Sequence, residues 1–311
     1  MAEINLFDIN RSVLKSPEEL IEESEKSYHS LVDGVADRIC SDKNVRILLV
    51  AGPSGSGKTT TANLISDKIK LHGEDCIVVS LDDFYRNNDD PNYPTQPDGS
   101  RDLEAAEALD IEAVTKTLMA IADSREFMLP KYDFKVSRRV EERLHTPMPN
   151  GCVIIEGLHA LNPMIFSKLP KEKCLKLFIS VSTNINNGGV RILSGRKIRF
   201  VRRMVRDSIY RNADAEKTLS LWKNVLLGED KYLYPNRKYA DFTFDTFHRF
   251  ELSAMRGFAE KLISKSLAEK DGYAGLTLAA MKKILPLDIS LIPEDSLIRE
   301  FIPGGKYESA Y

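Results

Sequence analysis

Cysteine is scarce in this chain, and its spacing gives it no special role. The four cysteines are scattered and include no CxxC pair. Cys76 and Cys152 each begin an apolar stretch of strand length, so we expect buried, reduced thiols. The five histidines also lack the spacing of metal ligands, and we therefore expect no structural metal.

Long apolar runs and a strong charge of either sign are missing as well. The longest apolar runs, such as ILLVAG, have the length of a strand and are far too short to span a bilayer. No signal peptide opens the chain. The formal net charge is only −2, so no overall charge attracts nucleic acid or an anionic membrane. We expect a cytoplasmic protein with neither nucleic acid nor membrane as a partner.

The first 45 residues predict a helical extension that packs on the main domain. Residues 16–39 place apolar side chains near one face of a helix. Ser16 is expected to cap this helix, Pro17 suits its first turn, and Glu19 completes a capping-box pattern. The extension carries no visible chemistry.

From residue 46 the pattern alternates between strand and helix. Continuous apolar strands separated by helices predict an α/β fold with a mainly parallel sheet covered on both faces. A polar stretch at 86–104 predicts a long loop, which in a compact domain is usually functional or disordered. We place one domain at 46–265 and a C-terminal extension of unassigned role at 266–311. The expected strands are 45–52, 76–81, 152–157, 176–181 and 241–246, and the expected helices between them include 59–71 and 110–123.

The stretch GPSGSGKT, residues 52–59, matches GxxxxGK[ST] in full, directly after a predicted strand and at the start of a predicted helix. Its glycines let backbone N–H groups surround phosphate oxygens, and the helix directs its positive end at them. Lys58 would supply a charge for the β- and γ-phosphates, and Thr59 a hydroxyl for Mg²⁺. The motif therefore predicts a nucleoside triphosphate site. Its expected ligands are Gly52, Ser54, Gly55, Ser56, Gly57, Lys58, Thr59 and Thr60.

Two classes of nucleotide-binding protein fit poorly. The guanine-reading sequence NKxD is absent, which argues against a GTPase. The stretch ILSGRK is similar to an ABC signature, but it follows the third predicted strand, and that strand lacks the Asp-Glu pair of ABC proteins. A kinase of a small molecule fits better.

Carboxylates end two of the predicted strands. In VVSLDDFYR, residues 78–86, Asp82 and Asp83 follow the strand after the phosphate-binding helix, and Glu156 ends the next strand. The carboxyl edge of a parallel sheet is where such proteins bind ligands. A capping turn would explain Asp82, Asp83 and Glu156 without chemistry. In a kinase, Asp82 would orient an alcohol and accept its proton, and Glu156 would hold Mg²⁺ through water.

The segment 191–211 holds eight basic residues against one acid, Asp207. A solvated helix face, a nucleic-acid surface and a lid over the triphosphate all fit this pattern. We favour a lid at about 190–230, because guanidinium groups neutralise the charge of a transferring phosphoryl group and closure excludes water. On a helix, one side would carry Arg199, Arg202, Arg203 and Arg206.

The motifs GPSGSGKT, SLDDFYR, LPKYDF, IIEG, RRMVRD and KYAD occur in the order and approximate spacing of the uridine/cytidine kinases and their phosphoribulokinase relatives. The resemblance covers about residues 46–265. It is closer still to a long bacterial branch in which the lid continues into a Trp-containing helix and the chain ends with a motif similar to REFIGG. In this chain the corresponding stretches are TLSLWKNVLLGED and SLIREFIPGG. It implies a P-loop NTPase fold of the nucleoside-kinase type, a three-layer sandwich with a helical lid. It also suggests a homo-oligomer and Mg²⁺ with ATP as donor.

The resemblance also implies roles for individual residues. Asp82 matches the catalytic base, and Lys58 and Arg206 complete the catalytic set. Substrate contacts are implied for Asp82, Phe84, Tyr85, Glu107, Tyr132 and Arg203. Lid arginines are implied at Arg202, Arg206 and Arg211, and Mg²⁺ contacts at Thr59, Glu156 and Asp82.

The chain departs from the family where the base is read. Ser137 replaces the histidine that follows the YDF motif. At the end of the lid this chain has Arg211-Asn212-Ala213 where the family has Arg-Gly-Arg, so one lid arginine is missing. His159 follows the third strand and is expected to be a satisfied loop histidine, and Trp222 a packing residue. The phosphoryl-transfer residues are therefore retained while base recognition is altered.

These patterns predict transfer of the γ-phosphate of ATP to the primary hydroxyl of a nucleoside, first of all uridine or cytidine. A kinase of a sugar phosphate or another small alcohol would use the same residues. A regulatory protein that binds ATP without phosphorylating a small molecule is the alternative outside enzymes.

Overall fold

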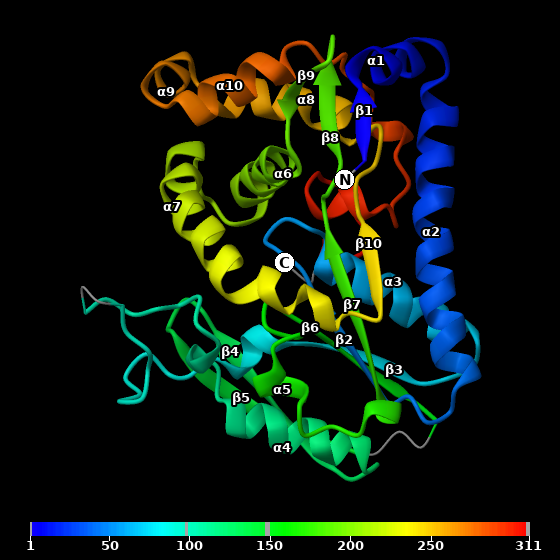
Figure 1. Ribbon diagram of the computed structural model, residues 1–311, viewed down its shortest axis with the longest axis vertical. Coiled ribbons are helices and arrows are strands. Elements are labelled where there is room, and N and C mark those ends of the chain that lie inside the picture. Colours follow the sequence, from blue (N-terminus) through cyan, green and yellow to red (C-terminus); the bar gives the residue numbers. More distant parts are fainter. Residues whose placement is uncertain (1, 97–98, 147–149, 309–311) are drawn as a thin grey trace.

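The computed structural model describes residues 2–96, 99–146 and 150–308. Five parallel strands in the order β10-β7-β2-β6-β3 form the central sheet (Figure 1). The phosphate-binding motif follows β2, which lies in the middle of the sheet. These strands are β2 (Ile47–Ala51), β3 (Cys76–Ser80), β6 (Cys152–Glu156), β7 (Cys174–Ser180) and β10 (Phe242–Asp245).

Helices cover both faces of this sheet. Side chains alternate along a strand, so Leu48 and Val50 of β2 join one apolar core while Ile47 and Leu49 join the other. The first core includes side chains of α2, α3, α6 and α8, and the second includes those of α4 and α5. The layers are therefore helix, sheet and helix. The helices are α1 (Leu6–Lys15), α2 (Pro17–Ser41), α3 (Lys58–Leu71), α4 (Ile111–Ala122), α5 (Pro163–Phe166), α6 (Gly195–Tyr210), α7 (Ala215–Gly228), α8 (Glu251–Leu262), α9 (Lys265–Lys270) and α10 (Gly272–Met281).

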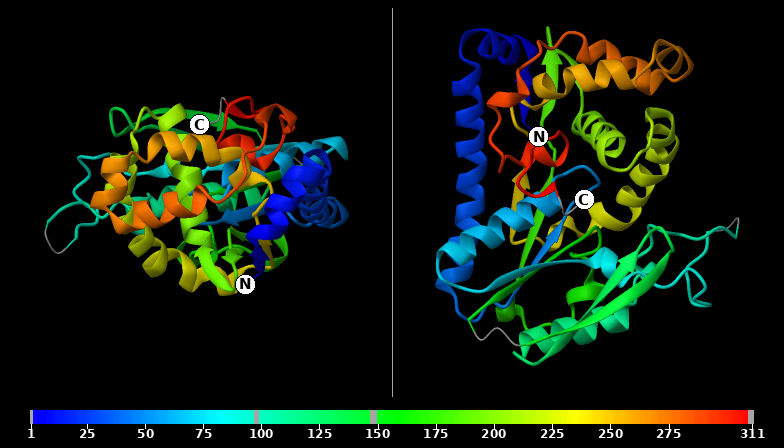
Figure 2. Two further views of the ribbon diagram at one scale, coloured as in Figure 1. Left: turned by 90° about the horizontal axis from the view of Figure 1, so that it is seen from above. Right: turned by 180° about the vertical axis from the view of Figure 1, so that it is seen from behind.

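Two small sheets flank the central one. β7 continues beyond its end into β8, which pairs with β1 on one side and β9 on the other (Figure 1). An antiparallel hairpin of β4 and β5 projects, together with the described loop residues 86–96 and 99–104, on the opposite side from α2 (Figures 1 and 2). The bounds are β1 (Glu3–Asn5), β8 (Asn184–Asn187), β9 (Val190–Leu193), β4 (Phe127–Asp133) and β5 (Arg138–His145).

Both extensions pack against the first core. α2 lies along α3, and the Tyr28 hydroxyl is 2.6 Å from the Thr61 hydroxyl. The 3₁₀ turn Leu297–Glu300 of the C-terminal extension also lies beside α3, in the middle of the molecule (Figure 2). The boundaries at residues 45 and 265 remain a proposal, since the two extensions share one apolar core with α6 and α8.

The central elements agree with the sequence predictions. The five expected strands, the helices expected at 59–71 and 110–123, and the buried state of Cys76 and Cys152 are all present. The capping prediction for α2 was wrong: the Ser16 side chain makes no cap bond, because α1 runs directly into α2 and the Ser16 amide donates to Ser12. Among the described residues, no helix combines the length and the apolar character needed to cross a bilayer.

Candidate functional site

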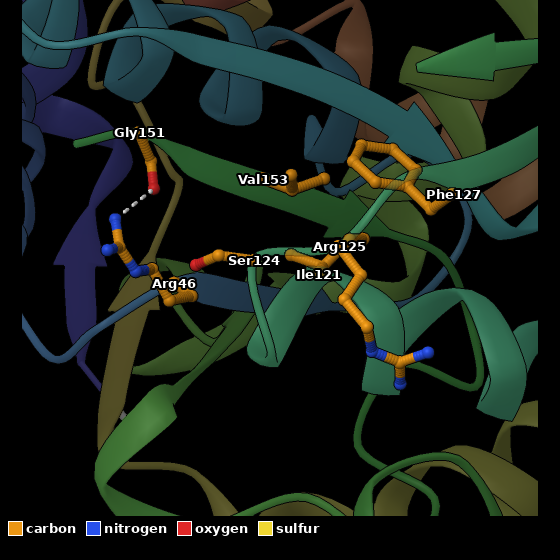
Figure 3. A pocket seen from close by; sticks show the side chains of 7 residues that line it. All are labelled: Arg46, Ile121, Ser124, Arg125, Phe127, Gly151 and Val153. Carbon is orange, nitrogen blue, oxygen red and sulfur yellow. Dashed lines mark hydrogen bonds between the residues drawn. The ribbon is translucent and has the colours of Figure 1, made fainter. Parts of the chain in front are cut away.

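The site lies at the carboxyl edge of the sheet, where three neighbouring strands end. β2 leads into the phosphate-binding loop, β6 ends at Glu156, and β3 leads into a 3₁₀ turn, Leu81–Phe84, that carries Asp82. β6 lies between β2 and β3, with Ser80 opposite Glu156. The chain order therefore brings the loop and both carboxylates together. A small cavity lined by residues that include Arg46 and Gly151 lies at the opposite, amino-terminal edge of the sheet and is not part of this site (Figure 3).

The phosphate-binding loop reaches α3 through Gly57, whose φ of +89° suits glycine. Lys58 begins α3, and its ammonium group is 3.5 Å from the Pro53 carbonyl. The Thr61 hydroxyl donates to the Gly57 carbonyl and fixes the same turn. The loop therefore presents its amides and Lys58 at the N-terminus of a 14-residue helix, as an anion site requires.

A buried ion pair supports the loop from behind. Both Nη atoms of Arg199 lie 2.8 Å from the carboxylate of Glu229, and both side chains are fully buried. Glu229 accepts the Ser54 amide at 2.9 Å, and Arg199 donates to the Ser54 carbonyl at 2.8 Å. The ring of Trp222 lies 5.5 Å from the same guanidinium. This contact is consistent with the expectation that Trp222 is a packing residue. The ion pair holds Ser54 in place by bonding both its amide and its carbonyl.

The structure does not fit a lid role for Arg202. Its side chain is fully buried and pairs with Glu251 through Nε and Nη2. Its other N–H groups meet the Thr246 carbonyl and hydroxyl and the Gly55 carbonyl. All five donors are thus used within the fold. Helical spacing placed these arginines on one side of α6. At Arg199 and Arg202 this side faces the protein interior, where the buried carboxylates of Glu229 and Glu251 neutralise the two guanidinium groups.

Three other arginines converge on one acid. Asp207, the single acid of the basic segment, pairs with Arg203 at 3.2 Å, Arg206 at 2.9 Å and Arg211 at 3.6 Å. Arg203 also donates to the Ser54 hydroxyl at 2.8 Å, which brings it to the phosphate-binding loop. Repulsion from Arg206, together with burial, lowers the pKa of Arg211. The carboxylate of Asp207 therefore holds three positive groups together near the loop.

The two acids of the 3₁₀ turn have separate surroundings. Asp83 accepts the Tyr132 amide at 3.2 Å and pairs with Lys131 at 3.1 Å, so it anchors the β4–β5 hairpin. Within the described residues, the Asp82 carboxylate has neither a hydrogen bond nor an ion pair, and it is open to solvent. The surrounding protein raises the pKa of Asp82 by desolvation, and Lys58 opposes that rise. Asp82 is therefore the carboxylate that is available to a substrate.

Glu156 is buried beside Lys58. Burial raises the pKa of Glu156 to about 7, although the Lys58 ammonium opposes the rise. Asp82 and Glu300 add to it by repulsion. Asp82 and Glu156 are hard oxygen donors, and a divalent cation close to them would favour their charged forms.

Aromatic side chains gather next to Asp82. The ring of Tyr85 lies 5.8 Å from that of Tyr132 and 5.9 Å from that of Phe134, and the latter two rings are 4.9 Å apart. Phe134 is largely exposed. Phe84, expected in the substrate pocket, is instead 2% exposed and packs in the α4-side core, because its position in the turn faces the sheet. Phe134 takes its place in the aromatic cluster of Tyr85, Tyr132 and Phe134.

Two acids of the loop before α4 have different surroundings, and Glu107 is the one that was expected to contact the substrate. Glu107 is exposed, and within the described residues its backbone carbonyl, rather than its side chain, accepts a hydrogen bond, from Arg86. Glu104, three residues earlier, is half-buried and lies near Arg203 and Asp82, and burial raises its pKa to about 7. Both acids lie in a loop, which has no regular periodicity, so the sequence could not show which of the two side chains points toward the site.

His159 differs from the expectation of a satisfied loop histidine. It is 3% exposed, neither ring nitrogen has a hydrogen bond of good geometry, and burial lowers its pKa to about 4. Its ring packs edge-on to Tyr232 at 6.1 Å. The imidazole is therefore neutral.

The C-terminal segment supplies a contact that the sequence did not predict. Glu300 accepts the Thr60 hydroxyl at 3.0 Å and approaches the Thr60 amide at 3.4 Å. Thr60, expected to bind nucleotide, thus already meets an anion. The motif SLIREFIPGG was visible in the sequence, but nothing local tied it to the phosphate-binding loop.

Comparison with known proteins identifies relatives of this chain. Residues 47–253 match the model of the Phosphoribulokinase / Uridine kinase family. A uridine kinase of Lactobacillus johnsonii is 27% identical over 196 residues, 63% of this chain and 83% of that protein. A uridine kinase of Borrelia hermsii is 29% identical over 198 residues, 63% of this chain and 84% of that protein.

Two solved structures are similar at lower identity. A possible uridine kinase from Bacillus stearothermophilus has a TM-score of 0.45 and 18% identity, over 70% of this chain and 100% of that one. A D-glycerate 3-kinase from Cryptococcus neoformans has a TM-score of 0.45 and 15% identity, over 68% of this chain and 88% of that one.

The family match spans the central sheet, the phosphate-binding loop, both strand-end carboxylates and the arginines of α6. The chain belongs to the phosphoribulokinase/uridine kinase family and is a phosphotransferase with an alcohol acceptor.

Proposed function

We propose that this kinase transfers the γ-phosphate of ATP to the 5′-hydroxyl of uridine or cytidine. The observation that carries the proposal is the Asp82 carboxylate, which is free of partners in the described residues and lies near Lys58 and the Tyr85 ring. A carboxylate in that position orients a primary hydroxyl and accepts its proton as the phosphoryl group is transferred. A cytoplasmic location, a role in pyrimidine salvage and assembly into a homo-oligomer are parts of the same proposal.

Lys58 and the loop amides form the donor side. The Ser54 amide is bonded to Glu229, so the amides next to it in the loop would contact the phosphates in its place. The residues around the phosphates would be Gly52, Ser54, Gly55, Ser56, Gly57, Lys58, Thr59 and Thr60. Arg203, Arg206 and Arg211 would neutralise the transferring group. Their shared partner Asp207 keeps them together before the substrate arrives.

Mg²⁺ would be held by the Thr59 hydroxyl, Glu156 and Asp82. The ion supplies charge neutralisation on the phosphates. It needs only one or two protein carboxylates beside the phosphates. The raised pKa values of Asp82 and Glu156 support this role, since a nearby cation would favour both ionised forms.

The acceptor side combines apolar and acidic groups. The aromatic cluster gives flat apolar surfaces for a base, and Glu104 gives a carboxylate for ribose hydroxyls. The hydroxyl of Ser137, beside Tyr132, replaces an imidazole and offers a shorter hydrogen-bonding group. A nucleoside matches this pairing of rings and acid better than an acyclic alcohol does.

The test measures ADP production from Mg-ATP with uridine, cytidine, purine nucleosides, ribulose 5-phosphate and pantothenate. We expect turnover with uridine or cytidine. The Asp82→Asn enzyme should lose about 10²- to 10⁴-fold in kcat and still bind ATP. Asp83→Asn is the matched control, since Asp83 anchors the hairpin, and it should affect mainly the KM of the acceptor.

Turnover of ribulose 5-phosphate or pantothenate alone would move the assignment to another alcohol. ATP binding without turnover of any acceptor would leave a regulatory protein as the explanation. Full activity of Asp82→Asn would rule out the proposed proton acceptor.

A further inference from the structure

The segment from Ser296 to Ile302 lies against the phosphate-binding loop, and the reaction as proposed leaves it without a role. A Cβ on Gly57 would be 2.6 Å from Leu297, so the two are in direct contact. Leu297, Ile298, Phe301 and Ile302 are fully buried. The segment is therefore a packed part of the fold next to the nucleotide site.

Glu300 projects from this segment to two groups that the proposed function assigns to phosphate. One carboxylate oxygen meets the hydroxyl and amide of Thr60, and the other lies 3.8 Å from Arg206. Glu300 is only 4% exposed. The amides in the first turn of such a helix bind the α- and β-phosphates of a nucleotide. Glu300 thus presents a carboxylate to groups that would otherwise meet a phosphate.

We propose that the Glu300 carboxylate is an internal competitor of the nucleotide phosphates, and that ATP binding displaces it from Thr60. The inference rests on the proposed function in taking this loop as the ATP site. An amide N–H has one proton, so it does not serve two anions at full strength. A buried carboxylate this close to a triphosphate also repels it.

The backbone of the segment is held too firmly to leave with the side chain. The Arg299 guanidinium donates to the carbonyls of Ile289, Pro293, Ile292 and Pro303. The Tyr210 hydroxyl, at the end of α6, donates to the Ile302 carbonyl at 3.2 Å. Displacement is therefore a rotation of the Glu300 side chain.

The same rotation would release Arg206. Glu300 and Asp207 both lie within ion-pair distance of this guanidinium. When Glu300 leaves, the phosphates replace one of the two negative partners of Arg206. Glu300 also helps to raise the pKa of Glu156, which puts its charge in the same cluster as the proposed magnesium ligand. Nucleotide binding and the positioning of Arg206 are thus linked through one carboxylate.

The experiment measures the affinity of Mg-ATP and Mg-ADP for the full-length protein by calorimetry, without an acceptor. Glu300→Gln keeps the shape and can still accept from Thr60, but it removes the charge. We expect it to bind both nucleotides about tenfold more tightly. Glu294→Gln is the control, because Glu294 is exposed and lies just before the segment, and its side chain makes no hydrogen bond or ion pair with the phosphate-binding loop within the described residues. Its affinity should equal that of the wild type.

Glu300→Asp serves as a second variant if Glu300→Gln does not fold. It keeps the charge but shortens the reach to Thr60, so it should also bind nucleotide more tightly than the wild type does. Unchanged or weaker binding in the folded variants would overturn the inference and make Glu300 a structural support of the loop. Tight ATP binding without turnover of any nucleoside would overturn only the proposed acceptor. No ATP binding by any of the proteins would overturn both.

Discussion

Arg199 and Glu229 form a two-pronged ion pair behind the phosphate-binding loop, with no exposed surface on either side chain. The pair joins α6 to the turn that follows α7 and holds both peptide groups of Ser54. The pair matters for stability because each fully buried side chain supplies a counter-charge for the other.

Glu229→Gln should therefore destabilise the protein strongly. Removing one partner leaves the Arg199 guanidinium buried without its counter-charge, which costs about 3–5 kcal/mol. Urea denaturation would measure the loss in the free energy of unfolding. Asp230→Asn is the control, because Asp230 pairs with Arg196 at the surface, where a pair is worth about 0–1 kcal/mol. Equal losses in the two variants would contradict the special role of the buried pair.

Glu104 and Glu107 give a matched test of the acceptor site. Glu104→Gln should raise the KM of the acceptor about 10- to 100-fold, since a hydrogen bond to a charged group is worth about 1.5–3 kcal/mol. Glu107→Gln should leave it unchanged, because this side chain is exposed. Steady-state kinetics at varied acceptor concentration would decide. A larger effect at Glu107 would restore the assignment made from the sequence.

The stability of the protein should depend on Glu156 between about pH 4.5 and 7. The pKa of this carboxyl is about 7 in the folded protein, above its ordinary value of 4.5. The folded state then holds more protons than the unfolded state in this window, so the contribution of Glu156 to stability falls as the pH rises. The fall amounts to at most about 3 kcal/mol. In Glu156→Gln this part of the pH dependence should vanish.

Unfolding curves at pH 4.5, 5.5, 6.5 and 7.5 would test that prediction. Glu104 has a raised pKa of the same size, so the wild-type slope contains both groups. The difference between wild type and Glu156→Gln isolates one of them. Parallel pH profiles would show that Glu156 titrates near its ordinary pKa.

Gly57 and Leu297 should be energetically coupled. Gly57 and Gly73 both have positive φ, but a Cβ meets Leu297 only at Gly57 and open space at Gly73. Gly73→Ala should cost about 1 kcal/mol from backbone strain alone. Gly57→Ala should cost about 1–3 kcal/mol more through overpacking. Adding Leu297→Ala should relieve that excess.

A double-mutant cycle on the free energy of unfolding would measure the coupling. We expect the double variant to lose at least about 0.5 kcal/mol less than the sum of the two single losses. Strict additivity would mean that the C-terminal segment and the loop do not press on each other.

Local patterns predicted the frame of the molecule well. The strands of the central sheet and the loop at 52–59 were visible because a buried strand and a glycine-rich turn leave their mark within a few residues. The same reasoning failed for Arg202. Helical spacing identified a common side for the arginines, but their partners Glu229 and Glu251 are 30 and 49 residues away, so nothing nearby showed that the side is internal.

The candidate site was predictable only where its residues follow strands directly. The expectation that Asp82 and Glu156 share one edge of the sheet was made in this way. Phe84 was expected to contact the substrate but packs in the core, because the turn after β3 directs its ring inward, and Phe134 lies in the aromatic cluster instead. Glu300 could not have been found, since its relation to Thr60 depends on the path of the whole C-terminal extension.

The parallel pairing of β1 with β8 has a consequence for synthesis on the ribosome. Glu3, Ile4 and Asn5 lie opposite Asn184, Ile185 and Asn186, and the Asn186 amide donates to the Glu3 carboxylate. β1 therefore stays unpaired during synthesis until β8, much later in the chain, has been made. A contact between segments so far apart in sequence forms late, so the edge of β1 is exposed to proteases and chaperones until β8 is in place.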